Sequence, residues 1–333
     1  MFELSFIWAG IIAFAVLTYV ILDGFDLGVG ILFPFAKGER DKATMMNSIA
    51  PIWDGNETWL VLGGGGLFAV FPLAYAVVMP ALYMPITLML LALIFRGVAF
   101  EYRWRTKRWK PVWDAAFFGG SLVAAFMQGI ALGALVQGIE IADRAYAGGW
   151  WDWLSPFSVL TGVAVVTGYA LLGSTWLILK TEGALQRQMQ RHAWWCAAGT
   201  LGFIGLVSLL TPFQDPVYFS RWFNLPGSIF SVLMPGALAL ATWALFAGLN
   251  ADRDGQPFFA ALTLFVLCFI GIGISFYPHI VPPGLTIAEA AAPNASLKFA
   301  LVGTVVLVPL ILGYTAYAYW VFRGKVDPEE GYH

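Results

Sequence analysis

The stretch VILDGFDLGVGILFPF (residues 20–35) places two carboxylates, Asp23 and Asp26, within a run of apolar residues. Their i, i+3 spacing puts both side chains on one face of a helix. A charge in the hydrocarbon core of a bilayer costs several kcal/mol, so an acid at such a position is usually functional or paired. We therefore interpret this stretch as a membrane-spanning helix with two acids on one face.

A second apolar stretch, NSIAPIWDGNETWLVLGGGG (47–66), repeats the pattern with Asp54 and Glu57. Proton relays are the commonest use of acids inside membranes. The alternative is that the acids lie at helix ends near the lipid headgroups, where caps and neighbouring charges satisfy them. Four acids in two consecutive helices favour the relay. The glycines Gly63 to Gly66 predict close packing of this helix on a neighbour.

The composition of the whole chain is that of an integral membrane protein. Of its 333 residues, 59% are hydrophobic and 11% are charged, whereas a soluble domain has about 25% charged residues. A net charge of −2 gives no support for nucleic-acid binding. The two cysteines, Cys196 and Cys268, lie in apolar runs and predict neither a disulfide framework nor a metal site. The first apolar run is too long for a signal peptide and lacks its basic flank, so we expect it to remain as a membrane-spanning helix.

The number of membrane crossings follows from the apolar runs, since about 20 apolar residues are needed to span the bilayer. The second and third runs are separated only by an expected tight turn at Met79-Pro80, and merging them would give eight helices. We predict nine membrane-spanning helices, at about residues 6–33, 58–78, 81–100, 114–136, 156–179, 193–213, 227–249, 257–277 and 298–322.

The basic residues of the loops favour nine helices over eight. Cytoplasmic loops carry an excess of Lys and Arg, and with eight helices the basic loops would scatter over both sides. With nine, one side holds Lys37, Arg40, Lys42, Arg103, Arg105, Lys107, Arg108, Lys110, Lys180, Arg187, Arg191, Arg253, Arg323 and Lys325, and the other holds only Arg144, Arg221 and Lys298. The N-terminus is therefore predicted to lie outside and the C-terminus in the cytoplasm.

This topology gathers the acids at the cytoplasmic ends of the first three helices. The third helix ends in FRGVAFEYR (95–103), which contains Arg96 and Glu101. We expect Arg96 to compensate part of the acidic charge, because buried charges need partners. A proton taken up from the cytoplasm would enter at this cluster. On the opposite side, the loops at about 137–155 and 278–297 are expected to lie along the interface and to fold over the outer surface.

Metal ligands are scarce in this sequence. Haem and copper sites usually need His, Met or Cys, and the three histidines are His192, His279 and His333. The predicted topology puts the first two at opposite faces of the membrane, so they cannot jointly bind one haem. No HExxH, P-loop or dinucleotide-binding motif is present. We predict that the chain ligates no metal and that a redox function would need a partner subunit.

Seven ordered motifs make the chain resemble subunit II of the cytochrome bd-type quinol oxidases, including the cyanide-insensitive branch. The resemblance covers nearly the whole length. The motifs are DGFDLGVG (23–30), NSIAPIWDGNETWL (47–60), LIFRGVAFEYR (93–103), GSTWLILKTEG (173–183), SFYPHIVPP (275–283), NASL (294–297) and VVLVPLILGYTAYAYW (305–320).

The resemblance implies an all-α membrane protein of two four-helix bundles plus a peripheral helix. We assign residues 1–140 to the first bundle with the acid cluster, and 141–333 to the second bundle, the peripheral last helix and a short cytoplasmic tail. The implied partner is a haem-bearing subunit I in the bacterial inner membrane, which holds haem b and haem d, oxidises quinol and reduces O2 to water. A structural quinone in this chain and a small single-span accessory subunit are left open.

Members of this family take up protons from the cytoplasm through subunit II. Residue by residue, the uptake acid corresponds to Asp54 in WDGNETW, with Trp59 beside it and Glu101 further along, where the family often has Asp. Glu57 stands where relatives carry Gln. Together with Asp23 and Asp26, these residues form the predicted proton pathway, compensated by Arg96, and the chain itself is assigned no catalytic residue.

Two functions are alternatives to an oxidase subunit that supplies a scaffold and a proton channel: a stand-alone transporter and a non-catalytic assembly subunit. A stand-alone proton-coupled transporter would have inverted repeats with broken helices. Prolines do interrupt several runs (Pro72, Pro85, Pro235 and Pro309), but the second half has no matching acid pair. A non-catalytic assembly subunit is the third function. The sequence favours the oxidase subunit.

Overall fold

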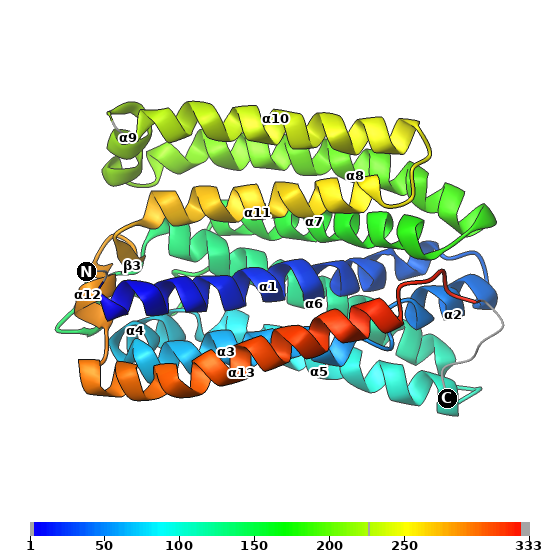
Figure 1. The fold of residues 1–333 in the computed structure, drawn as a ribbon, viewed down its shortest axis with the longest axis horizontal. Coiled ribbons are helices and arrows are strands. Elements are labelled where there is room, and N and C mark those ends of the chain that lie inside the picture. Colours follow the sequence, from blue (N-terminus) through cyan, green and yellow to red (C-terminus); the bar gives the residue numbers. More distant parts are fainter. Residues whose placement is uncertain (1–2, 226, 328–333) are drawn as a thin grey trace.

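The computed structural model describes residues 3–225 and 227–327, which form a set of long, roughly parallel helices (Figure 1). The α-helices are α1 Leu4–Leu32, α2 Glu39–Asn47, α3 Trp53–Val70, α4 Pro72–Ala81, α5 Tyr83–Arg105, α6 Lys110–Gln137, α7 Pro156–Lys180, α8 Gly183–Leu210, α9 Pro216–Phe223, α10 Ser228–Asn250, α11 Gln256–Phe276, α12 Ile287–Ala290 and α13 Asn294–Val321. The 3₁₀ turns η1 Phe33–Phe35 and η2 Thr211–Phe213 extend α1 and α8, and two antiparallel hairpins pair β1 Ile141–Ala142 with β2 Ala145–Tyr146 and β3 His279–Val281 with β4 Leu285–Thr286.

Eight of the helices in the described residues are long and apolar enough to cross a membrane. They correspond to eight of the nine expected runs, so those predictions are confirmed. They are α1 with η1, α5, α6, α7, α8 with η2, α10, α11 and α13.

The second expected helix, 58–78, is wrong as a single span. The chain there forms α3 and the short α4, with a break at Phe71 (φ −129°, ψ 60°). The break follows from Pro72, which lacks an N–H and disfavours the helical conformation of the residue before it. The expected turn at Met79-Pro80 is also wrong, because Pro80 lies inside α4 and the helices separate at Leu82 instead.

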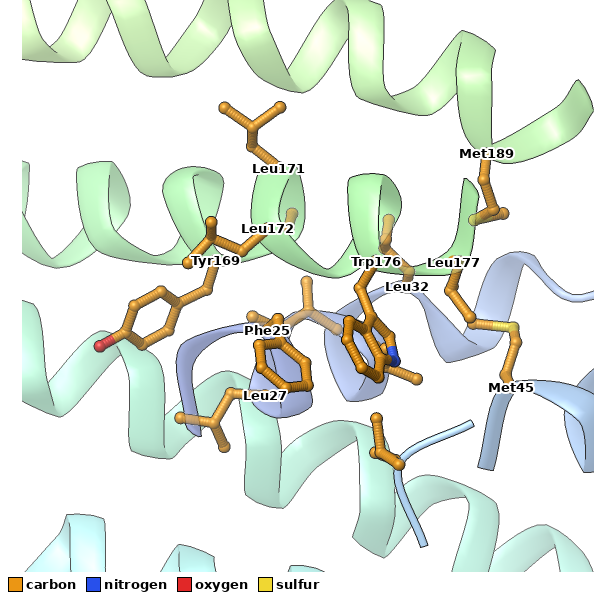
Figure 2. Packing of buried hydrophobic residues seen from close by; sticks show 14 of the residues in the cluster. Phe25, Leu27, Leu32, Met45, Tyr169, Leu171, Leu172, Trp176, Leu177 and Met189 are labelled. Carbon is orange, nitrogen blue, oxygen red and sulfur yellow. The ribbon is translucent and has the colours of Figure 1, made fainter. Parts of the chain in front are cut away.

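Helix α1 lies at the centre of the molecule and packs on α3, α6 and α7. Its contact with α7 is closest where two glycines meet: a Cβ on Gly28 would lie 1.8 Å from the Tyr169 carbonyl oxygen, and one on Gly173 would lie 2.2 Å from the Gly28 carbonyl carbon. Beside this crossing, Phe25 stacks on Trp176 with ring centroids 4.3 Å apart (Figure 2). The apolar core therefore runs without a break from the first half of the chain into the second.

The glycine run of α3 packs closely on α1 at two of its four positions. A Cβ on Gly66 would meet the Ile12 side chain at 2.4 Å, and one on Gly63 would meet Val16 at 3.3 Å. Gly64 and Gly65 have nothing within 4 Å of such a Cβ. The prediction of close packing is thus confirmed for Gly63 and Gly66 and is wrong within this chain for the other two, which face outward.

The β3–β4 hairpin and α12 close the end of the molecule at which α1 begins (Figure 1). Val281, Leu285 and Ile287 share an apolar cluster with Trp8 of α1. The Trp8 indole also donates a hydrogen bond to the Leu297 carbonyl at 3.0 Å, which fixes the start of α13. The expected folding of loop 278–297 over one end of the helices agrees with these contacts.

Helix α13 is the least buried of the long helices and lies against α1 and α3. The segment that follows it is fastened to the end of α7. Lys180 donates hydrogen bonds to the carbonyls of Phe322 and Gly324. Lys325 donates to the Thr181 carbonyl at 3.0 Å and forms an ion pair with Asp254 at 2.7 Å. These bonds satisfy carbonyls that a helix end leaves without partners.

Candidate functional site

A buried arginine connects three helices of the first half. Nη1 of Arg96 on α5 lies 2.5 Å from Oε1 of Glu57 on α3 and 3.5 Å from Oδ1 of Asp23 on α1. The side chains of Arg96 and Asp23 are 0% and 1% exposed, whereas that of Glu57 is 23% exposed. A charge is tolerated at such depth only when it is paired, so Arg96 holds the two mutually repelling carboxylates in place.

Two aromatic rings cover the same guanidinium. The centroids of Trp53 and Phe100 lie 5.9 Å and 5.5 Å from the Arg96 guanidinium carbon, and the two rings stack on each other at 4.6 Å. Ring faces attract a cation and exclude water from it. The arginine is therefore held in one position between α1, α3 and α5.

A second polar group joins Asp26 to the last helix. Asn56 on α3 donates from Nδ2 to Oδ2 of Asp26 at 2.7 Å, and its Oδ1 accepts from the Tyr319 hydroxyl of α13 at 2.9 Å. Asp26 and Asn56 are buried. Sequence reasoning missed Asn56 and Tyr319, although Asn56 lies between the two acids of α3 and an amide is also costly to bury without a partner.

A third polar group leads away from Asp23 toward α7. Tyr169 donates to Oε1 of Gln128 on α6 at 2.7 Å, and Nε2 of Gln128 donates to the Tyr19 hydroxyl at 2.8 Å. Tyr19 lies one helical turn before Asp23, on the same face of α1. These three residues were also missed, and the i, i+4 spacing of Tyr19 and Asp23 was the only signal for them.

Several polar atoms of this cluster make no hydrogen bond to the described part of the chain. They are both carboxylate oxygens of Asp23, Oδ1 of Asp26, and Nε and Nη2 of Arg96. Buried polar atoms are nearly always hydrogen-bonded, and exceptions gather at functional sites. The cluster therefore has donors and acceptors that the described residues leave unsatisfied.

The structure places the remaining predicted residues at different distances from the cluster. Asp54 is exposed in the first turn of α3, within electrostatic range of Glu57. Trp59 is buried between α3 and α1, where it packs with Ala15 and Tyr19. Asp54 thus lies at the rim of the cluster and Trp59 forms part of its wall.

Glu101 is separate from the cluster in this chain. Its side chain is 56% exposed and pairs with Arg105, one helical turn further along α5, at 3.2 Å. The expectation that all the acids share one site therefore describes Asp23, Asp26 and Glu57 better than Glu101.

Arg103 was expected in a solvated loop, and this prediction is wrong. Its side chain is 0% exposed and lies 2.6 Å from Asp114 on α6 and 3.0 Å from Glu39 on α2. Lys42 and Lys110 pair with the same two acids. Burial acts to raise the pKa of Glu39, but the hydrogen bonds and charges of Lys110 and Arg103 outweigh it and lower that pKa. The short helix α2, which the span pattern did not reveal, folds back over the ends of α5 and α6 and buries Arg103.

The second half of the chain contains a largely apolar cavity of about 300 Å³. It lies between α7, α8, α10 and α11, with residues such as Phe203, Phe230 and Phe265 on its walls. Thr200 also lines it, and the buried Thr200 hydroxyl has no hydrogen-bond partner in the described residues.

Side chains that could ligate a metal are not gathered together in the described part of the chain. The described residues contain no group of three or more His, Cys, Asp or Glu placed to hold a metal ion. His192 lies in α8 beside Phe35, and His279 lies in β3. β3 lies at the end of the molecule where α1 begins, and α8 begins at the opposite end (Figure 1). His333 is outside the described residues.

Comparisons with known proteins match nearly the whole chain. The family model described as "Cytochrome bd terminal oxidase subunit II" matches residues 4–322. Subunit 2 of the cytochrome bd-I ubiquinol oxidase of Escherichia coli K12 is 31% identical, over 98% of this chain and 96% of that protein. Subunit 2 of the cytochrome bd ubiquinol oxidase of Bacillus subtilis 168 is 30% identical, over 99% of each.

A solved structure shares the fold. A chain of the bd oxidase from Geobacillus thermodenitrificans superposes with a TM-score of 0.79, over 96% of this chain and 98% of that chain, at 19% identity.

Proposed function

Because the chain belongs to the cytochrome bd terminal oxidase subunit II family, and is thus a multi-pass membrane subunit of a bacterial bd-type respiratory oxidase, we propose that it supplies the complex with protons from the cytoplasm. The haem-bearing subunit I would consume them in reducing O2 to water. Taking those protons from the cytoplasm contributes to the proton motive force without pumping.

The observation that carries this proposal is the graded exposure of the acids. Asp54 is exposed, the Glu57 side chain is 23% exposed, and that of Asp23 is 1% exposed. Glu57 and Asp23 share one arginine nitrogen, so a proton gained by either changes the charge that Arg96 has to balance. A carboxylate at the surface followed by buried ones at short separation is the arrangement that a proton relay needs.

The chain would also be a scaffold for subunit I. Gly64 and Gly65 leave an open strip on α3, and small residues allow helices of two proteins to approach closely in a membrane. Val61 and Phe68 of the same helix are 73% and 61% exposed. We place the partner against this face of α3, next to Asp54, so that the protons pass directly from one subunit to the other.

The proposed arrangement of the chain is two four-helix bundles with α13 at the periphery. Residues 1–140 would provide α1, α3 with α4, α5 and α6, and residues 141–333 would provide α7, α8, α10, α11 and the last helix. The unbroken core around α1 and α7 supports a firm association of the two halves. Haem b and haem d would be held by subunit I, in keeping with the positions of His192 and His279 in this chain.

The two relatives named above are subunits of ubiquinol oxidases, and we assign the oxidation of quinol in the complex to the partner subunit. The apolar cavity lined by Thr200 is the place in this chain that suits a structural quinone, because it offers an apolar wall and a free hydroxyl for a carbonyl oxygen. A small single-span accessory subunit would find exposed apolar helix surface on α10 and α13.

The test is to replace the acids by their amides in the purified complex. Asp54→Asn should slow quinol-driven O2 uptake by about a hundredfold, the low end of what proton-transfer groups contribute. Glu57→Gln should slow it less, because Gln stands at this position in relatives that also take up protons. The haem spectrum of the complex should stay as in the wild type. The control is Glu182→Gln, an exposed acid at the start of α8, which should leave turnover unchanged. Organic extraction of the same preparations reports a bound quinone.

Each alternative predicts a different outcome. Wild-type turnover in both assembled amide variants would make this chain an assembly subunit without a proton route. Proton transport by the chain alone, without subunit I, would favour the stand-alone transporter.

A further inference from the structure

A hollow of about 610 Å³ lies between the first turns of α8 and the end of α10. Arg187, Arg191, Trp194 and Trp195 line its α8 side, and Leu249 and Asp252 line the other. It is far from the acid cluster, since α8 and α10 lie on the opposite side of the molecule from α3 and α13 (Figure 1). Nothing in the proposed proton uptake uses these residues.

The two arginines of this hollow are available to bind an anion. Arg187 and Arg191 are exposed, and their i, i+4 spacing puts both on one face of α8. Neither forms an ion pair or hydrogen bond with the described residues. The one acid of the hollow, Asp252, is engaged by Nε2 of Gln190 at 3.1 Å. The hollow is thus lined by two positively charged guanidiniums and one negatively charged carboxylate.

The tryptophans place this basic pair at the membrane boundary. Trp194 and Trp195 are 44% and 73% exposed, one turn deeper along α8, and their rings meet edge to face at 5.5 Å. Indole rings gather at the level of the lipid headgroups. The positive charges therefore lie at the height of lipid phosphates, with apolar surface below them.

The geometry points to a binding site for the headgroup of an anionic phospholipid in this hollow. The forked guanidiniums of Arg187 and Arg191 match a phosphate group, which accepts paired hydrogen bonds from them. The tryptophan rings and Leu249 pack along the start of the acyl chains. Basic pockets between membrane helices on the cytoplasmic side are suited to such lipids, and the sequence puts this end of α8 there.

Native mass spectrometry of the complete oxidase complex tests the site. The complex is placed in phosphatidylcholine nanodiscs with a minor fraction of phosphatidylglycerol. After the complex is released from the nanodiscs, the phosphatidylglycerol molecules that stay bound to it are counted. Arg187→Gln with Arg191→Gln should weaken retention at one site roughly 30-fold, since each basic residue near the surface contributes about fivefold. The single variant Arg191→Gln should weaken phosphatidylglycerol retention about fivefold. It is used in place of the double variant if the double variant does not assemble.

The matched control removes the same charge at the same end of the molecule. Lys107 and Arg108 are exposed, and Arg108 lies beside Trp109 without lining this hollow. Lys107→Gln with Arg108→Gln should retain phosphatidylglycerol as the wild type does. An equal loss in both double variants, or no loss in either, would overturn the site. Displacement of the lipid by inorganic phosphate would show a free-anion site and overturn the lipid assignment.

Discussion

Arg96 and Arg103 occur two turns apart on one helix, and both are buried among carboxylates. Arg96 lies between Glu57 and Asp23, and Arg103 lies between Asp114 and Glu39. Neither can reach water without disrupting its surroundings, so each fixes the helices that supply its partners. Arg105, by contrast, is 75% exposed, and among the described residues it forms an ion pair with Glu101 alone.

We expect Arg96→Leu to destabilise the complex by about 3–5 kcal/mol, because it leaves the buried Asp23 without its cation. Arg103→Leu should cost less, because Lys42 and Lys110 still pair with Asp114 and Glu39, which are partly exposed. Arg105→Leu removes a surface pair and should cost less than about 1 kcal/mol. Thermal unfolding of the purified complex, followed by loss of native-like tryptophan fluorescence, measures the three variants. A loss for Arg105→Leu as large as that for Arg96→Leu would show that exposure does not set the cost.

At the scale of the elements, the crossing of α1 and α7 depends on the absence of side chains. Gly28 lies in the stretch that contains Asp23 and Asp26, and it contacts the backbone of α7 at Gly173. The same crossing sets the distance between Tyr169 on α7 and Tyr19 on α1, which Gln128 bridges with two hydrogen bonds. The packing of two helices thus determines the position of polar groups on a third.

Gly28→Ala should push α1 and α7 apart, since its Cβ would overlap backbone atoms that cannot move aside. Overpacking of this kind typically costs about 1–3 kcal/mol. The control is Gly10→Ala on the same helix, whose Cβ would meet nothing within 4 Å and should be neutral or slightly stabilising. Yield and thermal stability of the complex give the comparison. Equal effects of the two changes would refute the close crossing.

At the scale of the whole molecule, α1 begins at one end and α13 finishes at the other (Figure 1). Such a path requires an odd number of crossings. Eight crossings are made by the long apolar helices. We propose that α3 and α4 together make the ninth. The basic residues then gather at the end where α13 finishes.

Reporter fusions test this topology. Fusions after Lys110, Arg191 and Lys325 should report the cytoplasm, and fusions near Asp143 and Pro283 should report the periplasm. The physical reason is the excess of Lys and Arg on the cytoplasmic side. A cytoplasmic signal from the 137–155 loop would contradict the nine crossings and would move the acid cluster to the other side of the membrane.

The sequence by itself determined the features that depend on composition and local order. Apolar length predicted eight of the long helices, and the cost of intramembrane charge singled out the acids Asp23, Asp26, Asp54 and Glu57. Arg96, expected to compensate them, pairs with Asp23 and Glu57. The motif order predicted the family to which the chain belongs. None of these required knowledge of which helix faces which.

Only the tertiary structure decided which polar groups share a site. Arg103 is buried because α2 folds over it, and Glu101, five residues after Arg96, points to a different environment. Tyr19, Gln128 and Tyr169 meet from three different helices, α1, α6 and α7. Helix-to-helix distances are set by packing of side chains over the whole molecule, and a linear pattern of hydrophobicity contains no information about that packing.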